Sequence, residues 1–293
     1  LLGSSPVENH AYLVEYDLTQ GIFSYEHAQS LNTYALEHDV QIKGHVKFDS
    51  GLNRLGLKNY EEIDKVMTMP GLKITGIYTH FASAQSYDEE ELDFSNQQVK
   101  RFKNLLHHLD EKGYDYGMTH MQNSPSILNF GDLGFDAVRC GMVLYGLFHP
   151  SQLRLATEAG FKPSLSMKVK IAHVKTIEKG ESVGYGRTFV ADKTMKIATI
   201  AGGYCDGIMR NLSKNGGFVV YQDQNCPILG DIAMSQFMVD VSHLKQVNVG
   251  DEVFIFGHPN LSIYDYIDYT DQTINELVSH LRLDMKRIYV NTK

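Results

Sequence analysis

The chain has 293 residues, 43% hydrophobic and 21% charged, which suits one large or two ordinary globular domains. Its formal net charge of -8 and the absence of a basic stripe argue against a nucleic-acid partner. The three cysteines lie far apart without metal-binding spacing, so we expect no metal site and free thiols in a reducing, cytoplasmic setting. No apolar run reaches membrane-spanning length, so no membrane contact is expected from this segment.

The first part of the chain, residues 1–162, alternates between strand-like and helical patterns. After a strand-like beginning, we predict strands at 41–48, 72–79, 119–122 and 137–139, and helices at 24–38, 59–70, 89–112 and 124–130. Ser24 is placed to cap the first helix, and Asn59 with Glu62 has capping-box spacing for the second. Repeated strand–helix units predict a parallel sheet of the (β/α) barrel type, with polar residues after the strand ends building a site.

Beyond Pro163 the pattern changes to short strands separated by glycine and Asn/Asp turns. The strand-like runs cover 164–177, 195–200, 218–221, 227–232, 237–241 and 252–256, and a helical pattern follows at 273–283. Residues 163–293 are therefore predicted to form a second, mainly β domain, either a small barrel or a sandwich. The fold class is thus an α/β barrel domain followed by a β domain.

One stretch stands out within the second part, where a buried strand ends at Gly202-Gly203 and is followed at once by Tyr204. A phenol held at a strand end could serve as a positioned acid or base. A free tyrosine has a pKa near ~10 and needs cationic neighbours to act as a base at neutral pH. Taken alone, the stretch favours the alternative, a structural tyrosine whose hydroxyl caps a loop.

Two further candidates follow predicted strands of the first part. Arg54 lies in a glycine-rich loop after a strand that carries Lys47 and Asp49. Arginine in such a loop can hold a carboxylate or phenolate by paired hydrogen bonds, although a surface arginine in an ordinary turn is an equal alternative. His80 follows the next strand and could stack on a ring, but taken alone this residue favours the alternative, a satisfied core histidine.

The next two strand ends suggest a phosphate site. Asn123 and Ser124 open a short helix, where free N–H groups and a hydroxyl can cradle phosphate, although plain helix capping is the commoner use of these residues. Arg139 ends the following strand, and Gly141 allows a close approach to the backbone. Gly141 could supply a second phosphate contact or be a packing glycine.

In this order the motifs resemble one family nearly end to end, the pyridoxal-phosphate-dependent alanine racemases. The matching blocks are Lys47 to Gly56, Thr79-His80-Phe81, Asn123-Ser124, Arg139 with Gly141, Leu144-Tyr145-Gly146, Val183 to Thr188, Gly203 to Gly207, Pro227-Ile228, Met234 with Gln236, and Val249 to Val253. Racemase domains attached to membrane proteins of glycopeptide resistance share this pattern. The resemblance implies interconversion of L- and D-alanine with pyridoxal phosphate, supplying D-amino acid for peptidoglycan.

The resemblance also implies how the cofactor would be held. Arg139 would face the pyridine nitrogen, and His80 would lie near both the ring and Arg139. Ser124 and Gly141 would bind the phosphate, with Asn123 lining the same cradle.

It further implies the substrate contacts. Arg54 would hold the cofactor's phenolic oxygen and the substrate carboxylate, steadied by Lys47 at a position that is often carbamylated in the family. Tyr204 would be the acid–base group on one face of the substrate Cα, and Met234 would touch the substrate. In the family both come from the partner subunit, which implies a homodimer with shared active sites.

Several departures from the family pattern leave alternatives open. The family's Schiff-base lysine has no counterpart here, so we expect a chain truncated at its N-terminus, with a non-catalytic cofactor-binding or regulatory relative as the alternative. Ser235 replaces an aspartate, Cys205 an alanine, and Leu283 aligns loosely with a phosphate-contacting tyrosine, which makes serine as credible a substrate as alanine. The barrel-only proteins of pyridoxal-phosphate homeostasis fit less well, because they lack the second domain.

Overall fold

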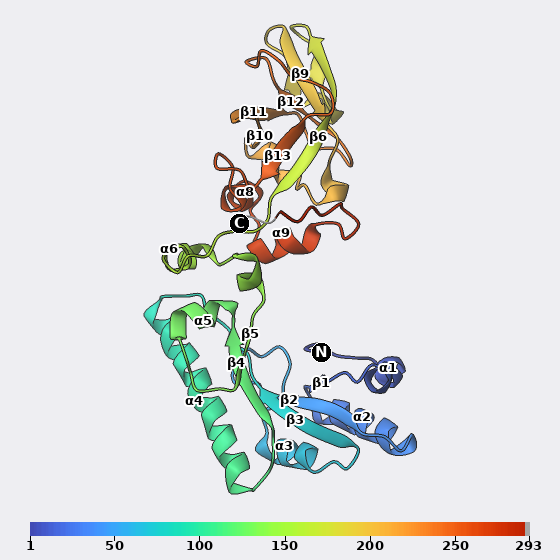
Figure 1. Cartoon of the computed structure of the whole chain (residues 1–293), viewed down its shortest axis with the longest axis vertical. Coiled ribbons are helices and arrows are strands. Elements are labelled where there is room, and N and C mark those ends of the chain that lie inside the picture. Colours follow the sequence, from blue (N-terminus) through green and yellow to red (C-terminus); the bar gives the residue numbers. More distant parts are fainter. Residues whose placement is uncertain (291–293) are drawn as a thin grey trace. The chain divides into compact units, whose positions relative to one another are not determined.

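The computed structural model describes residues 1–290 and divides into two compact units (Figure 1). The first unit is Leu1–Leu144 with Ser151–Gly160, and the second is Tyr145–Pro150 with Phe161–Lys293. A domain boundary after residue 162 stays a prediction.

The first unit is built on one parallel sheet whose five strands follow the chain in order. They are β1 (Gln20–Ile22), β2 (Ile42–Lys47), β3 (Leu72–Tyr78), β4 (Met118–Asn123) and β5 (Ala137–Arg139). Because all strands run in the same direction, their carboxyl ends meet at one edge, and the loops that follow them come together there. This is the strand–helix architecture that the sequence predicts, although β1 was not expected.

Helices follow the strands and bury a common core. The short 3-10 helices are η1 (Val7–Asn9), η2 (Met142–Tyr145) and η3 (Pro150–Gln152), of which η2 ends and η3 begins with a residue of the second unit. The α-helices of the unit are α1 (His10–Glu15), α2 (Tyr25–Glu37), α3 (Tyr60–Met67), α4 (Glu89–Glu111), α5 (Ser124–Phe130) and α6 (Leu153–Glu158). Figure 1 shows α2, α3 and α4 beside the sheet, and their side chains share one buried cluster with it, including Leu31, Ile63, Ile77 and Phe102. The core of the unit therefore lies between the helices and the sheet.

Two local predictions for this unit need correction. The beginning of the chain forms η1 and α1 rather than a strand, because His10 and Leu13 are buried at helical spacing. Ser24 caps α2 as predicted, but the side chain of Asn59 accepts from Glu61 N, and α3 shows no capping box with Glu62.

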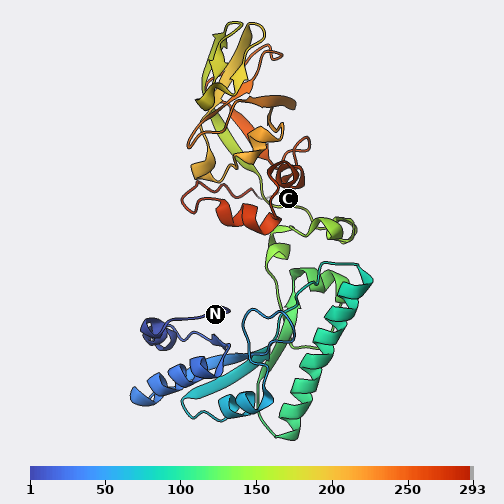
Figure 2. The same cartoon turned by 180° about the vertical axis from the view of Figure 1, so that it is seen from behind.

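The second unit contains a closed barrel, which decides between the two β architectures that the sequence allows (Figure 2). Its strands pair antiparallel in the order β10-β11-β12-β9-β6-β13. The strands of the unit are β6 (Met167–Ile177), β7 (Ser182–Val183), β8 (Phe189–Val190), β9 (Met195–Ile200), β10 (Phe218–Tyr221), β11 (Gln224–Leu229), β12 (Phe237–Asp240) and β13 (Glu252–Phe256). Closure leaves none of the six barrel strands with a free edge.

Short helices complete this unit: η4 (Tyr185–Arg187), η5 (Tyr204–Asp206), α7 (Asn211–Lys214), α8 (Ile263–Thr270) and α9 (Ile274–His280). Helix α8 was not predicted, although Ser262 and Asp265 form a capping box at its start. Within residues 1–290, no helix combines the length and apolar character needed to cross a membrane.

Candidate functional site

Arg139 is the centre of a polar cluster at the carboxyl ends of β3, β4 and β5. Its Nη1 lies 2.6 Å from Nδ1 of His120, and its Nη2 lies 2.8 Å from Nδ1 of His80. Nη2 also donates to the backbone carbonyls of Thr79 and Met121, at 2.8 and 3.0 Å. The side chain is therefore fixed from three strands at once.

The histidines beside Arg139 are held in the neutral form. Burial lowers the pKa of His120 to about 3 and that of His80 to about 4, with the charge of Arg139 as the next cause in both. Arginine can only donate, so both imidazoles accept from it through Nδ1. Nε2 of His120 then carries the proton and faces Nδ1 of His45 at 2.8 Å.

His120 and His45 were not singled out from the sequence. The signal that could have revealed His120 is its place on β4, one strand away from Arg139, together with the pairing of Asn123 with Arg139 between β4 and β5. His45 lies on β2, so its contact with His120 depends on the whole sheet and leaves no local pattern.

Arg139 itself remains a cation available to a ligand. Burial lowers its pKa to about 10, partly offset by Tyr78, and the guanidinium lies 5.3 Å from the centre of the Tyr78 ring. Across the described part of the chain, the guanidinium pairs with no carboxylate, and its Nε makes no hydrogen bond. Since arginine carries five N–H donors, a donor is left over for an outside acceptor.

The predicted phosphate cradle is present as a contact between two loops. The Oγ of Ser124 accepts from the backbone N–H of Gly141 at 2.9 Å and from that of Val143 at 3.4 Å. A Cβ on Gly141 would lie 3.6 Å from this oxygen. A side chain here would therefore occupy the space through which a ligand reaches the Ser124 hydroxyl. Ser124 is thus in contact with Gly141, which lies two residues after Arg139 in the chain.

The side chain of Asn123 acts as a helix cap. Its Oδ1 accepts from Ser126 N at 3.2 Å, and Ser126 Oγ accepts in return from Asn123 N at 2.8 Å, a capping box at the start of α5. The simpler of the two interpretations for this residue therefore holds, and a phosphate contact from Asn123 stays a prediction.

Lys47 and Arg54 face the same region from the end of β2 and the loop beyond it. Lys47 is buried, at 4% exposure. Its pKa is lowered by burial first, then by the charges of Arg54 and Arg139, while Asp49 acts in the opposite direction. Arg54 is exposed, and its charge also lowers the pKa of His80. The cluster therefore gathers three cations of the chain around neutral histidines.

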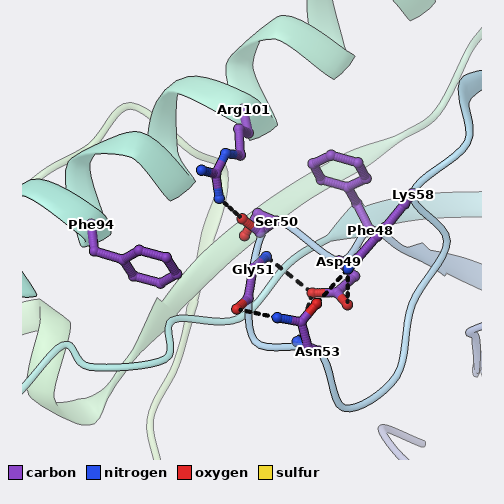
Figure 3. A pocket seen from close by; sticks show the side chains of 8 residues that line it. All are labelled: Phe48, Asp49, Ser50, Gly51, Asn53, Lys58, Phe94 and Arg101. Atoms are coloured by element: carbon purple, nitrogen blue, oxygen red, sulfur yellow. Dashed lines mark hydrogen bonds and ion pairs between the residues drawn. The ribbon is translucent and has the colours of Figure 1, made fainter.

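The loop that carries Arg54 is shaped by Asp49 (Figure 3). Oδ1 of Asp49 accepts from the N–H groups of Gly51 and Asn53, each at 3.0 Å. The backbone turns through positive φ at Gly51 (142°) and Asn53 (57°), the first of which only glycine adopts readily. These bonds set the path of the chain immediately before Arg54.

A pocket of ≈ 360 Å³ opens beside this loop, between it and α4. Figure 3 shows Phe94 and Arg101 of α4 on one side and Ser50 and Gly51 on the other. Lys47, Arg54 and Arg139 do not line it. The pocket is therefore separate from the cation cluster.

Tyr204 and Met234 lie together in the second unit. The N–H of Tyr204 donates to the carbonyl of Ala233 at 3.1 Å, and that of Cys205 donates to the carbonyl of Met234 at 2.9 Å. Both side chains are exposed, Tyr204 at 47% and Met234 at 60%. Gly203 is required between them, because a Cβ there would overlap the carbonyl oxygens of Ala233 and Met234.

The positions that depart from the family pattern are also exposed. Ser235 lies beside Met234, and Cys205 beside Tyr204. Leu283 is 92% exposed, and the structure shows no ligand-facing role for it. Of the nine predicted site residues, seven lie in the first unit and two, Tyr204 and Met234, in the second.

The comparisons with known proteins agree across the whole chain. The model of the alanine racemase N-terminal domain matches residues 1–149, and that of the alanine racemase C-terminal domain matches residues 164–289. The alanine racemase of Clostridium tetani is 35% identical over 88% of this chain and 66% of its own length. That of Clostridium perfringens is 32% identical over 99% of this chain and 75% of its own length.

Solved structures give the same result. Alanine racemase from Bacillus anthracis, with bound L-Ala-P, has a TM-score of 0.88 at 29% identity and covers 100% of this chain and 75% of its own. The enzyme from Bartonella henselae, with covalently bound pyridoxal phosphate, has a TM-score of 0.80 at 25% identity, covering 99% and 78%. The two domain models and the identities above 30%, together with the parallel strand–helix unit and the β-barrel unit, show that the chain belongs to the alanine racemase family.

Proposed function

We propose that the protein interconverts L- and D-alanine with pyridoxal phosphate as cofactor, supplying D-alanine for the cell wall. The observation that carries this is the fixed guanidinium of Arg139, held by neutral histidines and backbone carbonyls at the strand ends, next to the Ser124–Gly141 contact. The names of the relatives, which are alanine racemases, support the same substrate.

The residues present fit the ring nitrogen and the phosphate of the cofactor, whereas the lysine that would bind its aldehyde has no counterpart in residues 1–293. A pyridine nitrogen is an acceptor, and Arg139 retains an unused donor. The hydroxyl of Ser124 keeps its own proton to donate to phosphate, and the N–H groups of Gly141 and Val143, which donate to this hydroxyl here, would turn to the phosphate when it binds. When bound, pyridoxal phosphate supplies an electron sink that makes the Cα–H bond of an amino acid acidic. An arginine at the ring nitrogen would leave that nitrogen less protonated than an aspartate carboxylate would, which limits the stabilisation of the carbanion and suits a reaction that must return the proton.

The chain's own residues would then place the substrate and move its proton. Arg54 binds the substrate carboxylate through paired N–H donors, which fixes the amino acid against the cation cluster. The Oη of Tyr204 takes the Cα proton on one face, or delivers it there in the reverse direction. Met234, next to Tyr204, packs against the substrate and helps to exclude water.

Lys47 is proposed to be carbamylated. Its lowered pKa favours the neutral amine, which can attack carbon dioxide, forming an N–C bond and releasing one proton. The resulting anion would neutralise part of the charge of Arg54 and Arg139, the two cations that depress the lysine's pKa. A carbonyl signal from ¹³C-bicarbonate that disappears in Lys47→Met, observed by NMR, supports this; no signal in the unchanged protein contradicts it.

We further propose a homodimer in which Tyr204 and Met234 serve the partner subunit's site, and a cytoplasmic location. The exposure of both side chains supports the homodimer, because an exposed Tyr204 is free to reach a substrate bound by the partner subunit. The free thiols of Cys140, Cys205 and Cys226 suit a reducing compartment.

The test is to purify the complete gene product with pyridoxal phosphate, because residues 1–293 hold no counterpart of the family's Schiff-base lysine. D-alanine formation from L-alanine, and the reverse, are then measured, with serine in parallel. We expect racemisation of alanine in both directions and its loss in Arg54→Met. Cofactor binding without turnover of either amino acid would instead favour a non-catalytic binding protein. Faster turnover of serine than of alanine would assign serine as the substrate. The observation that supports serine is Ser235, which stands in place of the family's aspartate.

A further inference from the structure

Gln98, in the middle of α4, fastens two strand-end loops to one helix. The residue is fully buried, at 0% exposure. Its Nε2 donates to Ser50 Oγ and to the carbonyl of His80, both at 3.1 Å. Its Oε1 accepts from the N–H of Ala82 at 3.0 Å. Both ends of the amide are therefore used, and they bind the loop after β2 and the loop after β3.

The first of these loops leads to Arg54. Ser50 Oγ lies 2.7 Å from Oγ1 of Thr79, so the hydroxyl joins the ends of β2 and β3. Arg101, one turn beyond Gln98 on α4, donates from Nη1 to the carbonyl of Ser50 at 2.8 Å (Figure 3). Ser50 is thus held from its hydroxyl and its carbonyl, at the base of the loop whose path Asp49 sets.

The second loop supports Arg139. Its first residues, Thr79 and His80, provide two of the acceptors that fix the guanidinium, the Thr79 carbonyl and the His80 ring, each at 2.8 Å. Gln98 also holds these two residues. It donates directly to the His80 carbonyl, and it is linked to the Thr79 hydroxyl through Ser50 Oγ. The position of Arg139 therefore depends on a segment that Gln98 anchors.

We infer that Gln98 is a positioning residue of the racemase site. It fixes the position of the substrate-binding Arg54 relative to the cofactor-facing Arg139. The inference rests on the proposed function and names no contact between Gln98 and either ligand. Its physical basis is that a displacement of about 1 Å at the reacting groups can cost on the order of 100-fold in rate. A buried amide with three hydrogen bonds is suited to prevent such a displacement.

Two variants test this, with a matched control on the next residue. Gln98→Met keeps the side-chain length but removes all three hydrogen bonds. Gln98→Glu keeps an acceptor for Ala82 N and removes the two donors. Gln97→Met is the control, because Gln97 is exposed and, among residues 1–290, its side chain hydrogen-bonds only to Asp93 and Arg101 of the same helix. Its bond to Arg101 uses Nη2, whereas Arg101 holds Ser50 through Nη1.

The first readout is hydrogen exchange of the cofactor-free protein, which does not depend on activity. In Gln98→Met we expect the amide of Ala82 and those of residues 50–54 to exchange at least ~10-fold faster, with α2 unchanged. In Gln98→Glu the Ala82 amide should stay near its original rate while residues 50–54 exchange faster. If the exchange rates of all amides, including those of α2, rise equally in the Gln98 variants, the cause is a general loss of stability, and the inference is overturned.

The second readout is substrate binding by the holoenzyme prepared from the complete gene product. We expect KM for both alanine enantiomers, and the inhibition constant of propionate, to rise about 10-fold in both Gln98 variants, because propionate offers Arg54 a carboxylate without an amino group. Gln97→Met should stay within about 2-fold of the unchanged protein. If all variants racemise alanine with unchanged KM and unchanged inhibition by propionate, the inference about Gln98 is overturned and the proposed function stands. Absence of racemisation in the unchanged holoenzyme overturns it together with the proposed function.

Discussion

Nη1 of Arg139 and Nδ1 of His120 are joined by a hydrogen bond of 2.6 Å in which the arginine can only donate. The bond therefore fixes the imidazole as neutral and places its proton on Nε2, toward His45. The imidazoles of His80 and His120 and the carbonyls of Thr79 and Met121 are neutral acceptors arranged around Arg139, so the charge of Arg139 acts on both rings.

Removing the charge of Arg139 should raise the pKa of its histidine neighbours. In Arg139→Gln we expect the pKa of His80 to rise from about 4 and that of His120 from about 3, because the charge of Arg139 lowers both. Burial remains, so neither should reach its ordinary value. Imidazole titration by NMR measures this, with Arg101→Gln as the control, and unchanged titration would show that the charge of Arg139 does not control these rings.

Gly203→Ala should disrupt the Tyr204 turn without unfolding the barrel of the second unit. The added methyl group would meet the carbonyl oxygens of Ala233 and Met234, which the turn cannot move without losing its own hydrogen bonds. We expect a loss of about 1–3 kcal/mol in the free energy of unfolding and a fall in kcat. Urea denaturation and steady-state kinetics measure the two effects.

Gly3→Ala is the control for that experiment, because a Cβ on Gly3 would meet no atom of residues 1–290 within 4 Å. Unchanged kcat in Gly203→Ala would mean that the turn does not hold a catalytic group.

Much of the fold could be predicted because it depends on local patterns. The bounds of α5, β9 and β13 agree with those expected from the sequence, since capping residues, glycine turns and apolar runs mark their ends. Strand β1 was missed because three residues are too few to show a period, and α8 because its aromatic residues resemble a strand.

The candidate site was predictable only in part. Residues that follow strands, such as His80, Ser124 and Arg139, are marked by their position in the strand–helix pattern. The contact of His45 with His120 spans 75 residues and that of Gln98 with Ser50 spans 48, and no local spacing reports either one. Buried polar contacts of this kind require the assembled sheet and its helix.

The free energy of unfolding should fall as the pH drops below neutrality, with His27 as one cause. His27 is buried against Phe23, and neither ring nitrogen has a partner within the described residues. Burial and then His10 lower its pKa to about 4. Its unfolded pKa is about 6.5, so the stability it contributes is complete above pH ~6.5 and is lost as the pH falls toward ~4.

His27→Phe should remove that dependence. Between pH 7.5 and 4.5 the variant should lose ~2 kcal/mol less than the unchanged protein, measured by urea denaturation at each pH. His107→Gln is the control, because His107 is 76% exposed. Parallel pH curves for His27→Phe and the unchanged protein would place the titration in other groups, such as His80 and His120.

Tyr204→Phe should abolish most racemisation while leaving the protein folded and able to bind its cofactor. The Tyr204 ring is 47% exposed and its hydroxyl makes no hydrogen bond to residues 1–290, so the loop-capping alternative has no structural support and removing the hydroxyl should cost little stability. General acid–base groups contribute ~10²–10⁴-fold, and we expect kcat to fall within that range in both directions. Pyridoxal-phosphate affinity should stay within about 2-fold, because the proposed cofactor contacts all lie in the first unit. Tyr16→Phe, at another exposed tyrosine, is the control. Turnover that persists in both directions would remove Tyr204 from the reaction, whereas loss of turnover together with cofactor binding would assign it to the cofactor site instead.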